Sequence, residues 1–381
     1  MFRFTQLLQS LIKTGNMVAE DRISQLEDTS VKELTTVRLR PETKAYLQSQ
    51  SETLGVSLSQ VINMILDGVV SMEMKPAADN KIKGIYDRIM SLFELHNINT
   101  VDMAKMLSGY GIKLSHLRNP DKFIDILSMD MIKEIADWFS INYKWIIGET
   151  NELYSPRDNT WYKDSYGFSL LLLEKSFRHS DLKVSVVKAN NVSFENAEKL
   201  EEQYSRLYVG FILSYTSTIN GVSFTKYEVC EFQRWNYDKC RGYLKFIFYF
   251  LDSVRSKINC QGVSFNEEIV DGLMAGRLFP STIKGMLSET WFIADRIGHI
   301  ESNYDVEINP VEYLNRFNRL IRLLRFGSSV TILDIEYTTK DFSYGWIIKY
   351  SCNGEFHTEF YHSLATGLDD IYDKFFVENP S

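Results

Sequence analysis

The chain has 381 residues, a formal net charge of −8 at pH 7 and 44% hydrophobic residues. This length allows two or three domains, and the apolar fraction is ordinary for a folded protein. The acidic balance excludes a general, sequence-independent nucleic-acid binder, which would be basic. Any contact with a polyanion must therefore depend on local basic patches.

Residues 1–30 are predicted to form an N-terminal arm. Their one amphipathic stretch, MFRFTQLLQSLIKTG, lacks the long apolar region and cleavage site of a signal peptide. No later run reaches transmembrane length. The four cysteines have no CxxC spacing and no histidine near them, which indicates reduced thiols rather than a zinc site. These cysteines are Cys230, Cys240, Cys260 and Cys352. We therefore expect a cytoplasmic protein with no membrane contact.

The segment 36–40, which reads TVRLR, is predicted to be a short strand. Its valine and leucine face one side, while Thr36, Arg38 and Arg40 face the other. One face is therefore apolar and the other is polar and cationic. A strand this short needs a partner strand, because alone it leaves its backbone groups unpaired.

Two helices are predicted after this strand. Pro41 suits the first position of a helix that runs to about Thr53, Gly55 ends it, and Ser57 caps the next helix. The second helix has more apolar surface than one shallow contact needs, so we expect it to be buried in a dimer. Its apolar residues at helical spacing are Val61, Ile62, Ile65, Leu66 and Val69.

This order of elements, over residues 31–73, resembles the ribbon-helix-helix family of DNA-binding proteins (Arc/MetJ/CopG-like). In that family two chains pair their strands into an antiparallel ribbon that enters the major groove. The resemblance places Thr36, Arg38 and Arg40 at the base-reading positions. It also places Ser57 and Ser59 where the second helix offers backbone N–H groups to a phosphate.

One departure from the family pattern is that Arg40 directly precedes Pro41, which favours a phosphate contact for this arginine rather than a base contact. An alternative for the whole segment is an edge strand and helical hairpin of a larger domain, with a solvated TVRLR face.

A second helical unit is predicted over residues 80–153. Thr100 is expected to cap a short helix, residues 108–111 (SGYG) make a turn, and another helix follows. The inner apolar positions of these two helices are Val101, Ala104, Leu107, Leu114 and Leu117. A tight turn between two short helices is how a helix-turn-helix is built.

This unit resembles the helix-turn-helix of the phage-repressor and Cro class. Its closing sequence, WIIGE from Trp145, is similar to the Trp-Leu-x-x-Gly-Glu ending of that class. The resemblance implies a recognition helix whose exposed face includes Lys113, Ser115, His116, Arg118 and Asn119, with Thr100 completing the candidate DNA-binding set. Asparagine and arginine can bond bidentately to adenine and guanine, whereas Lys113 suits a phosphate. The alternative is a degenerate unit used for packing or dimerisation, with His116 a surface residue.

Residues 160–381 resemble no family and are predicted to form an α+β domain. Asn220-Gly221 and Asn353-Gly354 each lie between alternating apolar stretches, which favours type I′ hairpins. Helical patterns cover 166–177, 194–204, 281–299, 310–326 and 364–375. Because strands and helices occur in runs, we expect an antiparallel sheet. The fold class is thus multidomain, with a mostly α N-terminal half and an α+β C-terminal domain.

No catalytic or metal-binding constellation is apparent. The histidines of the C-terminal part, His179, His299, His357 and His362, are isolated, and no HExxH, GxSxG, Walker A or GxGxxG motif occurs. The pairs Glu267-Glu268 and Asp369-Asp370 are expected to be solvated. We therefore expect no enzyme activity, no cofactor and no metal.

Arginines recur at every third position of one predicted helix, beside apolar residues at a/d spacing. They are Arg316, Arg319, Arg322 and Arg325, and the apolar seam is Leu314, Phe317, Ile321 and Leu324. Three interpretations remain open: a contact to DNA phosphates or an acidic partner, a second dimer contact, and a core-packed helix with a solvated basic side.

Together these patterns predict a cytoplasmic, sequence-specific DNA-binding transcriptional regulator. It would act as a homodimer and read double-stranded DNA with a paired β-ribbon and a second helix-turn-helix. The alternative is a plasmid-maintenance or antitoxin-type DNA-binding protein whose C-terminal domain binds a protein partner. A small-molecule partner of that domain, or an enzyme delivered by the DNA-binding half, also stays open.

Overall fold

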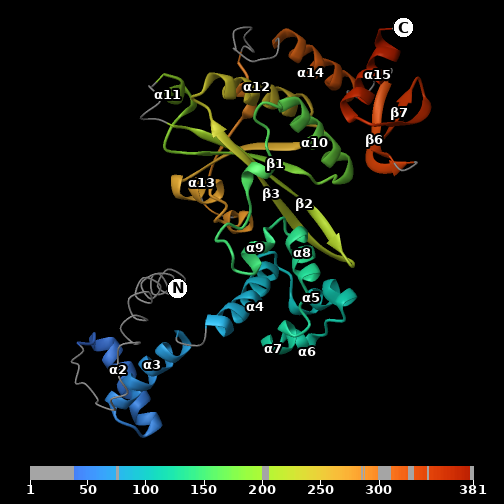
Figure 1. Ribbon diagram of the computed structural model, residues 1–381. Helices are drawn as coiled ribbons and strands as arrows, with labels where there is room; N and C mark the ends of the chain where they lie inside the picture. The colour runs from blue at the N-terminus through green and yellow to red at the C-terminus, as the bar shows by residue number, and fades with distance from the viewer. Residues whose placement is uncertain are drawn as a thin grey trace. The chain divides into compact units, whose positions relative to one another are not determined.

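The computed structural model describes residues 38–73, 77–199, 206–284, 286, 288–298, 310–324, 330–340 and 343–377. The chain divides into two compact units, residues 1–75 and 76–381, and Figure 1 gives the order of their elements. Several predicted features lie outside the described residues. These are the N-terminal arm, Thr36 and Val37 of the predicted strand, His299 and Arg325.

The described residues of the first unit form two helices, α2 (Pro41–Leu54) and α3 (Leu58–Glu73). Pro41 occupies the first turn of α2, where its missing N–H leaves no bond unmade. Gly55 ends α2 in the left-handed region with φ +65°, a conformation that glycine adopts without steric cost. The predicted start and end of this helix are therefore confirmed.

The second unit begins with short helices that we call the helical segment. They are α4 (Ala77–Leu95), α5 (Thr100–Met106), η1 (Leu107–Tyr110), α6 (Leu114–Leu117), α7 (Pro120–Ile124), α8 (Met129–Trp138) and α9 (Tyr143–Ile146). Ile89, Leu107, Phe123 and Ile135 are fully buried where these helices meet. A further turn, η2 (Pro156–Asp158), connects this segment to the rest of the unit.

A five-stranded sheet follows, in the order β3-β2-β1-β4-β5. Its strands are β1 (Lys183–Ala189), β2 (Tyr208–Ile219), β3 (Val222–Arg234), β4 (Asn259–Phe265) and β5 (Glu289–Trp291). The expectation of a purely antiparallel sheet is wrong, because β1 and β4 run parallel, with Lys183 opposite Asn259. Helix α12 (Asp238–Ser253) lies between β3 and β4, and a helical crossover of this kind brings β4 back in the same direction as β3 and β1.

The two faces of this sheet are covered by different helices. Val186 and Phe211 pack on one side with α10 (Ser165–Arg178) and α12, whereas Val187 and Ile212 pack on the other with α13 (Glu267–Met274) and the helical segment. Neighbouring residues face opposite sides because side chains alternate along a strand. Figure 1 shows α10 and α12 on one face and α8, α9 and α13 on the other. The helical segment thus shares a hydrophobic core with the sheet.

A three-stranded antiparallel sheet completes the second unit. Strands β6 (Val330–Lys340), β7 (Ser343–Cys352) and β8 (Glu355–Tyr361) lie in that order, with α14 (Pro310–Leu324) before them and α15 (Leu364–Phe376) after them. Phe317 of α14 and Tyr350 of β7 are fully buried in the core that α10 and α12 also enter. The described part of the chain is therefore an α+β architecture with two sheets.

Both predicted hairpins are confirmed. Asn220 and Gly221 have φ values of 49° and 75° between β2 and β3, and Asn353 and Gly354 have 49° and 87° between β7 and β8. Two successive positive φ angles define the type I′ turn, whose twist matches that of the paired strands.

The helical patterns at 166–177 and 364–375 are confirmed as α10 and α15. The pattern at 310–326 is described to Leu324 as α14, and the pattern at 194–204 is described to Lys199 as α11 (Phe194–Lys199). The helix expected at 281–299 is wrong. That stretch contains the end of η3 (Pro280–Ile283), strand β5 and the turn η4 (Ile293–Arg296). Strand β5 within this stretch pairs with β4, and its Trp291 lies opposite Gly262.

Candidate nucleic-acid interface

Exposed arginines precede the first helix of the N-terminal unit. Arg38 and Arg40 are exposed and Leu39 is half-buried, the alternation that the TVRLR pattern predicts for this stretch. The backbone of Arg40 is extended, with φ −63° and ψ 149°. Within the described residues, 38–40 have no strand beside them. An antiparallel ribbon would therefore require a second chain.

A capping box starts α3. The Ser57 N–H donates to Gln60 Oε1 at 2.8 Å, and the Gln60 N–H donates to Ser57 Oγ at 3.3 Å. This confirms Ser57 as the cap. Among the described hydrogen bonds, none engages the N–H groups of Leu58 and Ser59. An unoccupied N-terminal turn of this kind attracts anions, since its N–H groups and the helix dipole both carry partial positive charge.

Helix α3 exposes a stretch of three consecutive apolar side chains to solvent. Met64, Ile65 and Leu66 are 59%, 47% and 52% exposed. The large hydrophobic side chains that are buried in the described part of this unit are Leu47 and Val61, at 7% and 4% exposure. The described side chains of these two helices therefore supply little of the buried apolar surface that holds a small unit together in water.

The helical segment differs from the prediction at its first cap. Asn99, not Thr100, caps α5, since Asn99 Oδ1 accepts from the N–H groups of Val101 at 2.9 Å and Asp102 at 3.0 Å. Thr100 is instead the first residue of the helix. Asparagine is among the strongest N-cap residues, so it takes this role from the threonine beside it.

The predicted recognition helix is interrupted. Helix α6 is a single turn ending at Leu117, and Asn119 caps the separate helix α7, with its Oδ1 accepting from the Lys122 N–H at 3.2 Å. The reason is Pro120, which has no N–H and disfavours a helical conformation in the residue before it. Asn119 therefore does not lie on a recognition helix, and its carbonyl oxygen is occupied.

The anchoring of α6 also differs from expectation. Leu117 is 1% exposed, as predicted, but Leu114 is 40% exposed. Ile112, at 4% exposure, takes the second inner position. The shift by two residues follows from the left-handed turn at Gly111, which has φ +70°.

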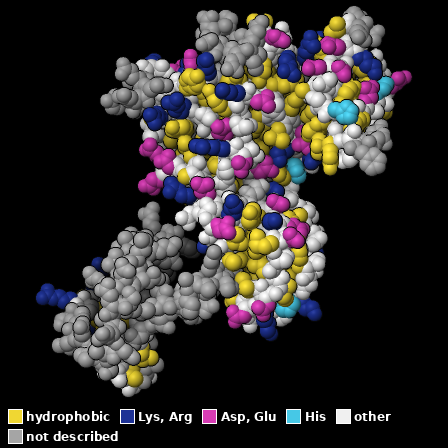
Figure 2. Space-filling model, in the orientation of Figure 1, with side chains coloured by type: hydrophobic (Ala, Val, Ile, Leu, Met, Phe, Trp, Pro, Cys, Tyr) yellow, Lys and Arg dark blue, Asp and Glu magenta, His cyan; other side chains and the backbone are white. Residues whose placement is uncertain are grey.

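The surface around α6 carries charges of both signs. Lys113, Ser115 and Arg118 are exposed, while His116 is half-buried and its Nδ1 accepts from the Lys113 N–H at 3.3 Å. Asp121 is exposed on the adjoining helix α7. Figure 2 shows basic, acidic and histidine side chains gathered at this end of the helical segment. The structure thus brings together Lys113, Ser115, His116 and Arg118, but not as a uniformly basic patch.

The arginine row of α14 is engaged within the chain. Arg316 pairs with Asp369 at 3.6 Å and Arg319 with Asp373 at 3.1 Å, both on α15. The neighbouring seam is core, since Phe317 and Ile321 are 0% and 4% exposed. The acidic partner considered for these two arginines is therefore α15 of the same chain, and the seam is not a free dimer contact.

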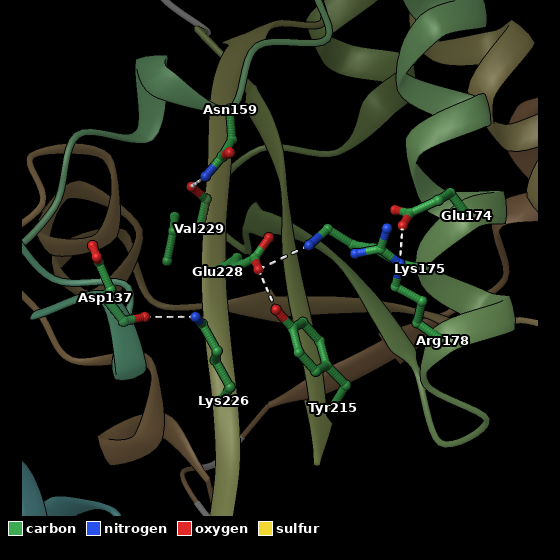
Figure 3. Close-up of polar contacts among 9 residues, drawn as sticks. All are labelled: Asp137, Asn159, Glu174, Lys175, Arg178, Tyr215, Lys226, Glu228 and Val229. Atoms are coloured by element: carbon green, nitrogen blue, oxygen red, sulfur yellow. Dashed lines mark hydrogen bonds and ion pairs between the residues drawn. The ribbon is translucent and has the colours of Figure 1, made fainter. Parts of the chain in front are cut away.

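A polar network joins the helical segment and α10 to strand β3, as Figure 3 shows. Lys226 Nζ donates to the Asp137 carbonyl at 2.6 Å. Glu228 pairs with Lys175 at 2.9 Å and accepts from Tyr215. Burial lowers the pKa of Lys226 and raises the pKa of Tyr215.

Each of these groups has a partner, so the network positions elements rather than offering a free acid or base. Sequence reasoning missed it. The available signal was the pair of opposite charges, Lys226 and Glu228, two residues apart in the predicted hairpin strand.

No group of three or more His, Cys, Asp or Glu side chains within the described residues could hold a metal ion. Nor does any helix in that part of the chain have the length and apolar character needed to cross a membrane. Cys230, Cys240 and Cys352 are buried free thiols, and Cys260 is half-buried. No family model, curated protein or solved structure matches this chain.

Proposed function

We propose that this protein is a cytoplasmic, sequence-specific DNA-binding regulator that acts as a dimer through its N-terminal unit. The observation that carries the proposal is the exposed apolar stretch of α3, formed by Met64, Ile65 and Leu66. A pair of helices that exposes such a stretch is stabilised when a second copy covers it.

The same dimer would supply a partner for residues 36–40. Two such segments pairing antiparallel would form a ribbon of the width that the major groove admits. Its outward side chains would include Arg38, whose guanidinium can bond bidentately to guanine. Arg40 and the first turn of α3 would contact phosphates on either side and fix the position of the ribbon.

The helical segment is assigned a secondary role in this proposal. Lys113, Ser115 and Arg118 are exposed around the single turn of α6, which suits contacts to the DNA backbone better than reading of bases. Removal of the Lys113 ammonium should then weaken binding to all sequences alike.

The direct test uses DNA sites selected from a random library and a mobility-shift assay on the full chain. Arg38→Ala should reduce affinity and relax specificity at one position, by about 1–3 kcal/mol if the contact is bidentate. Arg255→Ala is the matched control, because Arg255 is 77% exposed, follows α12 in the second unit and is not among the residues of the candidate interface. An Arg38→Ala variant with unchanged affinity and site preference rules out base reading by the ribbon.

Dimer formation has its own test by analytical ultracentrifugation. Ile65→Glu places a charge in the exposed apolar stretch of α3. This variant should be monomeric and should not bind DNA. Gln48→Glu adds the same charge at an exposed position of α2 and should leave the dimer intact. A dimer that survives Ile65→Glu contradicts the proposed interface. A protein of a different chain that co-purifies in equal amount would favour the antitoxin-type alternative.

A further inference from the structure

A cavity of about 620 Å³ lies where the helical segment meets the five-stranded sheet. Its walls come from α8, the loop after α8, residues 154–159 and strand β3. A water molecule takes about 30 Å³ in the liquid, so the cavity has the volume of roughly twenty waters. That size lies in the usual range for small-molecule sites and exceeds what a single ion needs.

The walls of the cavity are held by hydrogen bonds that need no ligand. The Asn142 N–H donates to the Leu153 carbonyl at 2.6 Å, and the Tyr154 hydroxyl donates to the Leu278 carbonyl at 2.7 Å. Asn159 Nδ2 donates to the Val229 carbonyl of β3 at 3.4 Å, which Figure 3 shows. The walls of the site are therefore preformed, whereas its charged side chains, Lys133, Asp137, Lys144 and Asp158, are exposed.

Two side-chain amides in the lining each keep one polar atom available. Asn142 Oδ1 accepts from the Lys144 N–H at 3.0 Å, which leaves its Nδ2 as a donor. Asn159 uses Nδ2, as above, which leaves its Oδ1 as an acceptor. Within the described residues neither remaining atom has a partner. One donor and one acceptor are what the C=O and N–H of a peptide group require.

The lining also carries positively and negatively charged side chains that do not pair with one another. Lys133 and Lys144 contribute ammonium groups, and Asp137 and Asp158 contribute carboxylates. In the part of the chain that the structure describes, none of these four forms an ion pair. Glu228, which also lines the cavity, is by contrast taken by Lys175. A ligand that carries a carboxylate and an amine could pair with both kinds of group.

We propose that this cavity binds a short peptide with free amino and carboxyl termini. The lysines take the terminal carboxylate, the aspartates take the terminal amine, and Asn142 and Asn159 bond the peptide groups between them. Because the ligand would touch both the helical segment and β3, its binding would stabilise their packing. This inference does not depend on DNA binding.

The test is calorimetric titration of the full chain with trialanine, N-acetyl-trialanine and trialanine amide. The two capped peptides each lack one terminal charge. Without one charge-assisted hydrogen bond, each of them should bind about tenfold to a hundredfold more weakly than trialanine. No binding of trialanine, or equal binding of all three peptides, overturns the proposal.

Variants of the lining residues test which side chains bind each end of the peptide. Asp137→Asn with Asp158→Asn should remove the preference for trialanine over its N-acetyl form. Lys133→Gln with Lys144→Gln should remove the preference over the amide. The controls are Asp125→Asn and Lys122→Gln on or next to α7, which do not line the cavity and should keep both preferences. Equal losses in the control variants would overturn the assignment, and tryptophan fluorescence verifies that each variant is folded.

Discussion

The side-chain amide of Asn220, at the tip of the β2–β3 hairpin, donates a 2.8 Å hydrogen bond to the backbone carbonyl of Met106 at the end of α5. Lys105 Nζ reaches the Gly221 carbonyl of the same hairpin at 3.4 Å. Farther along β3, the ring of Phe224 lies 5.2 Å from that of Phe139. These contacts of the β2–β3 hairpin therefore stabilise the packing of the helical segment against the sheet.

This relationship predicts different effects for two substitutions of Asn220. Asn220→Gly removes the hydrogen bond and keeps the positive φ, so it should cost about 1 kcal/mol of unfolding free energy. Asn220→Ala removes the same bond and leaves a Cβ in the left-handed region without the polar side chain that lets asparagine tolerate it, so it should be roughly 1–2 kcal/mol less stable than Asn220→Gly. The measurement is denaturant unfolding followed by tryptophan fluorescence, because all six tryptophans lie in residues 76–381.

The other hairpin supplies the control. Asn353 has the same φ of 49°, and within the described residues its side chain makes no comparable bond. Asn353→Gly should be close to neutral, and Asn353→Ala should show only the conformational cost. If the two glycine variants lose equal stability, the Asn220 bond to Met106 contributes nothing.

Glu174 of α10 is predicted to destabilise the protein when ionised. Burial raises the pKa of this carboxyl, although its ion partner Arg178 opposes the shift. Because the folded pKa lies above the unfolded one, the stability from protonated Glu174 is fully present below about pH 4.5 and is lost as the pH rises through the folded pKa. Glu174→Gln should therefore be more stable than the natural chain at neutral pH, and the gain should vanish in acid. A lower stability of this variant at neutral pH would contradict the sign.

Asp181 should show the opposite dependence. The hydrogen bond from the Thr216 hydroxyl lowers the pKa of this carboxyl, which also accepts the Thr216 N–H at 2.9 Å. Its stabilisation is present above the unfolded pKa of about 3.9 and is lost as the pH falls through the folded value. Asp181→Asn should thus be less stable at neutral pH, with a difference that shrinks toward acid. Unfolding curves recorded from neutral pH down to about pH 2 compare the two variants, and a difference that is constant across that range would refute the assignment.

The parts of the fold that could be predicted from sequence depend on local signals. Asn220-Gly221 and Asn353-Gly354 fix their turns through their own backbone preferences, and α14 and α15 follow from apolar spacing. The parallel pairing of β1 with β4 could not be predicted, because it joins residues far apart whose short apolar runs contain no register information. Helix α12 was missed because its run KFIFYFL is short and almost continuously apolar, and such a run does not distinguish a buried helix from a buried strand.

The candidate site also has features that local sequence signals predict and features that depend on tertiary packing. Ser57 and Gln60 form the cap that a local motif predicts, because both partners lie within one turn. The prediction of a single recognition helix was wrong because of Pro120. The effect of a proline on the conformation of the residue before it could have been recognised in the sequence. The engagement of Arg319 by Asp373 was beyond sequence reasoning, since only the packing of α15 against α14 brings these two together.

The ion pair between Arg319 and Asp373 leads to a prediction about how strongly this arginine is held within the chain. Arg319 and Asp373 are 3.1 Å apart with side chains 40% and 48% exposed, and Arg319 also lies 5.1 Å from the Tyr372 ring centre. Solvent screening at this exposure limits the ion-pair coupling to about 0.2–1 kcal/mol. A double-mutant cycle of Arg319→Ala with Asp373→Ala, measured by unfolding, should give a coupling in that range.

The same Arg319→Ala variant bears on function, because an arginine held by α15 is not available to DNA phosphates. It should keep the DNA affinity of the natural chain and the same dependence of affinity on salt. Arg40→Ala, which removes an arginine assigned to a phosphate, should instead lower the affinity and reduce the salt slope by about one unit. If Arg319→Ala changes the salt slope while the coupling to Asp373 is absent, the row on α14 faces an external polyanion and its pairing with α15 is not maintained in solution.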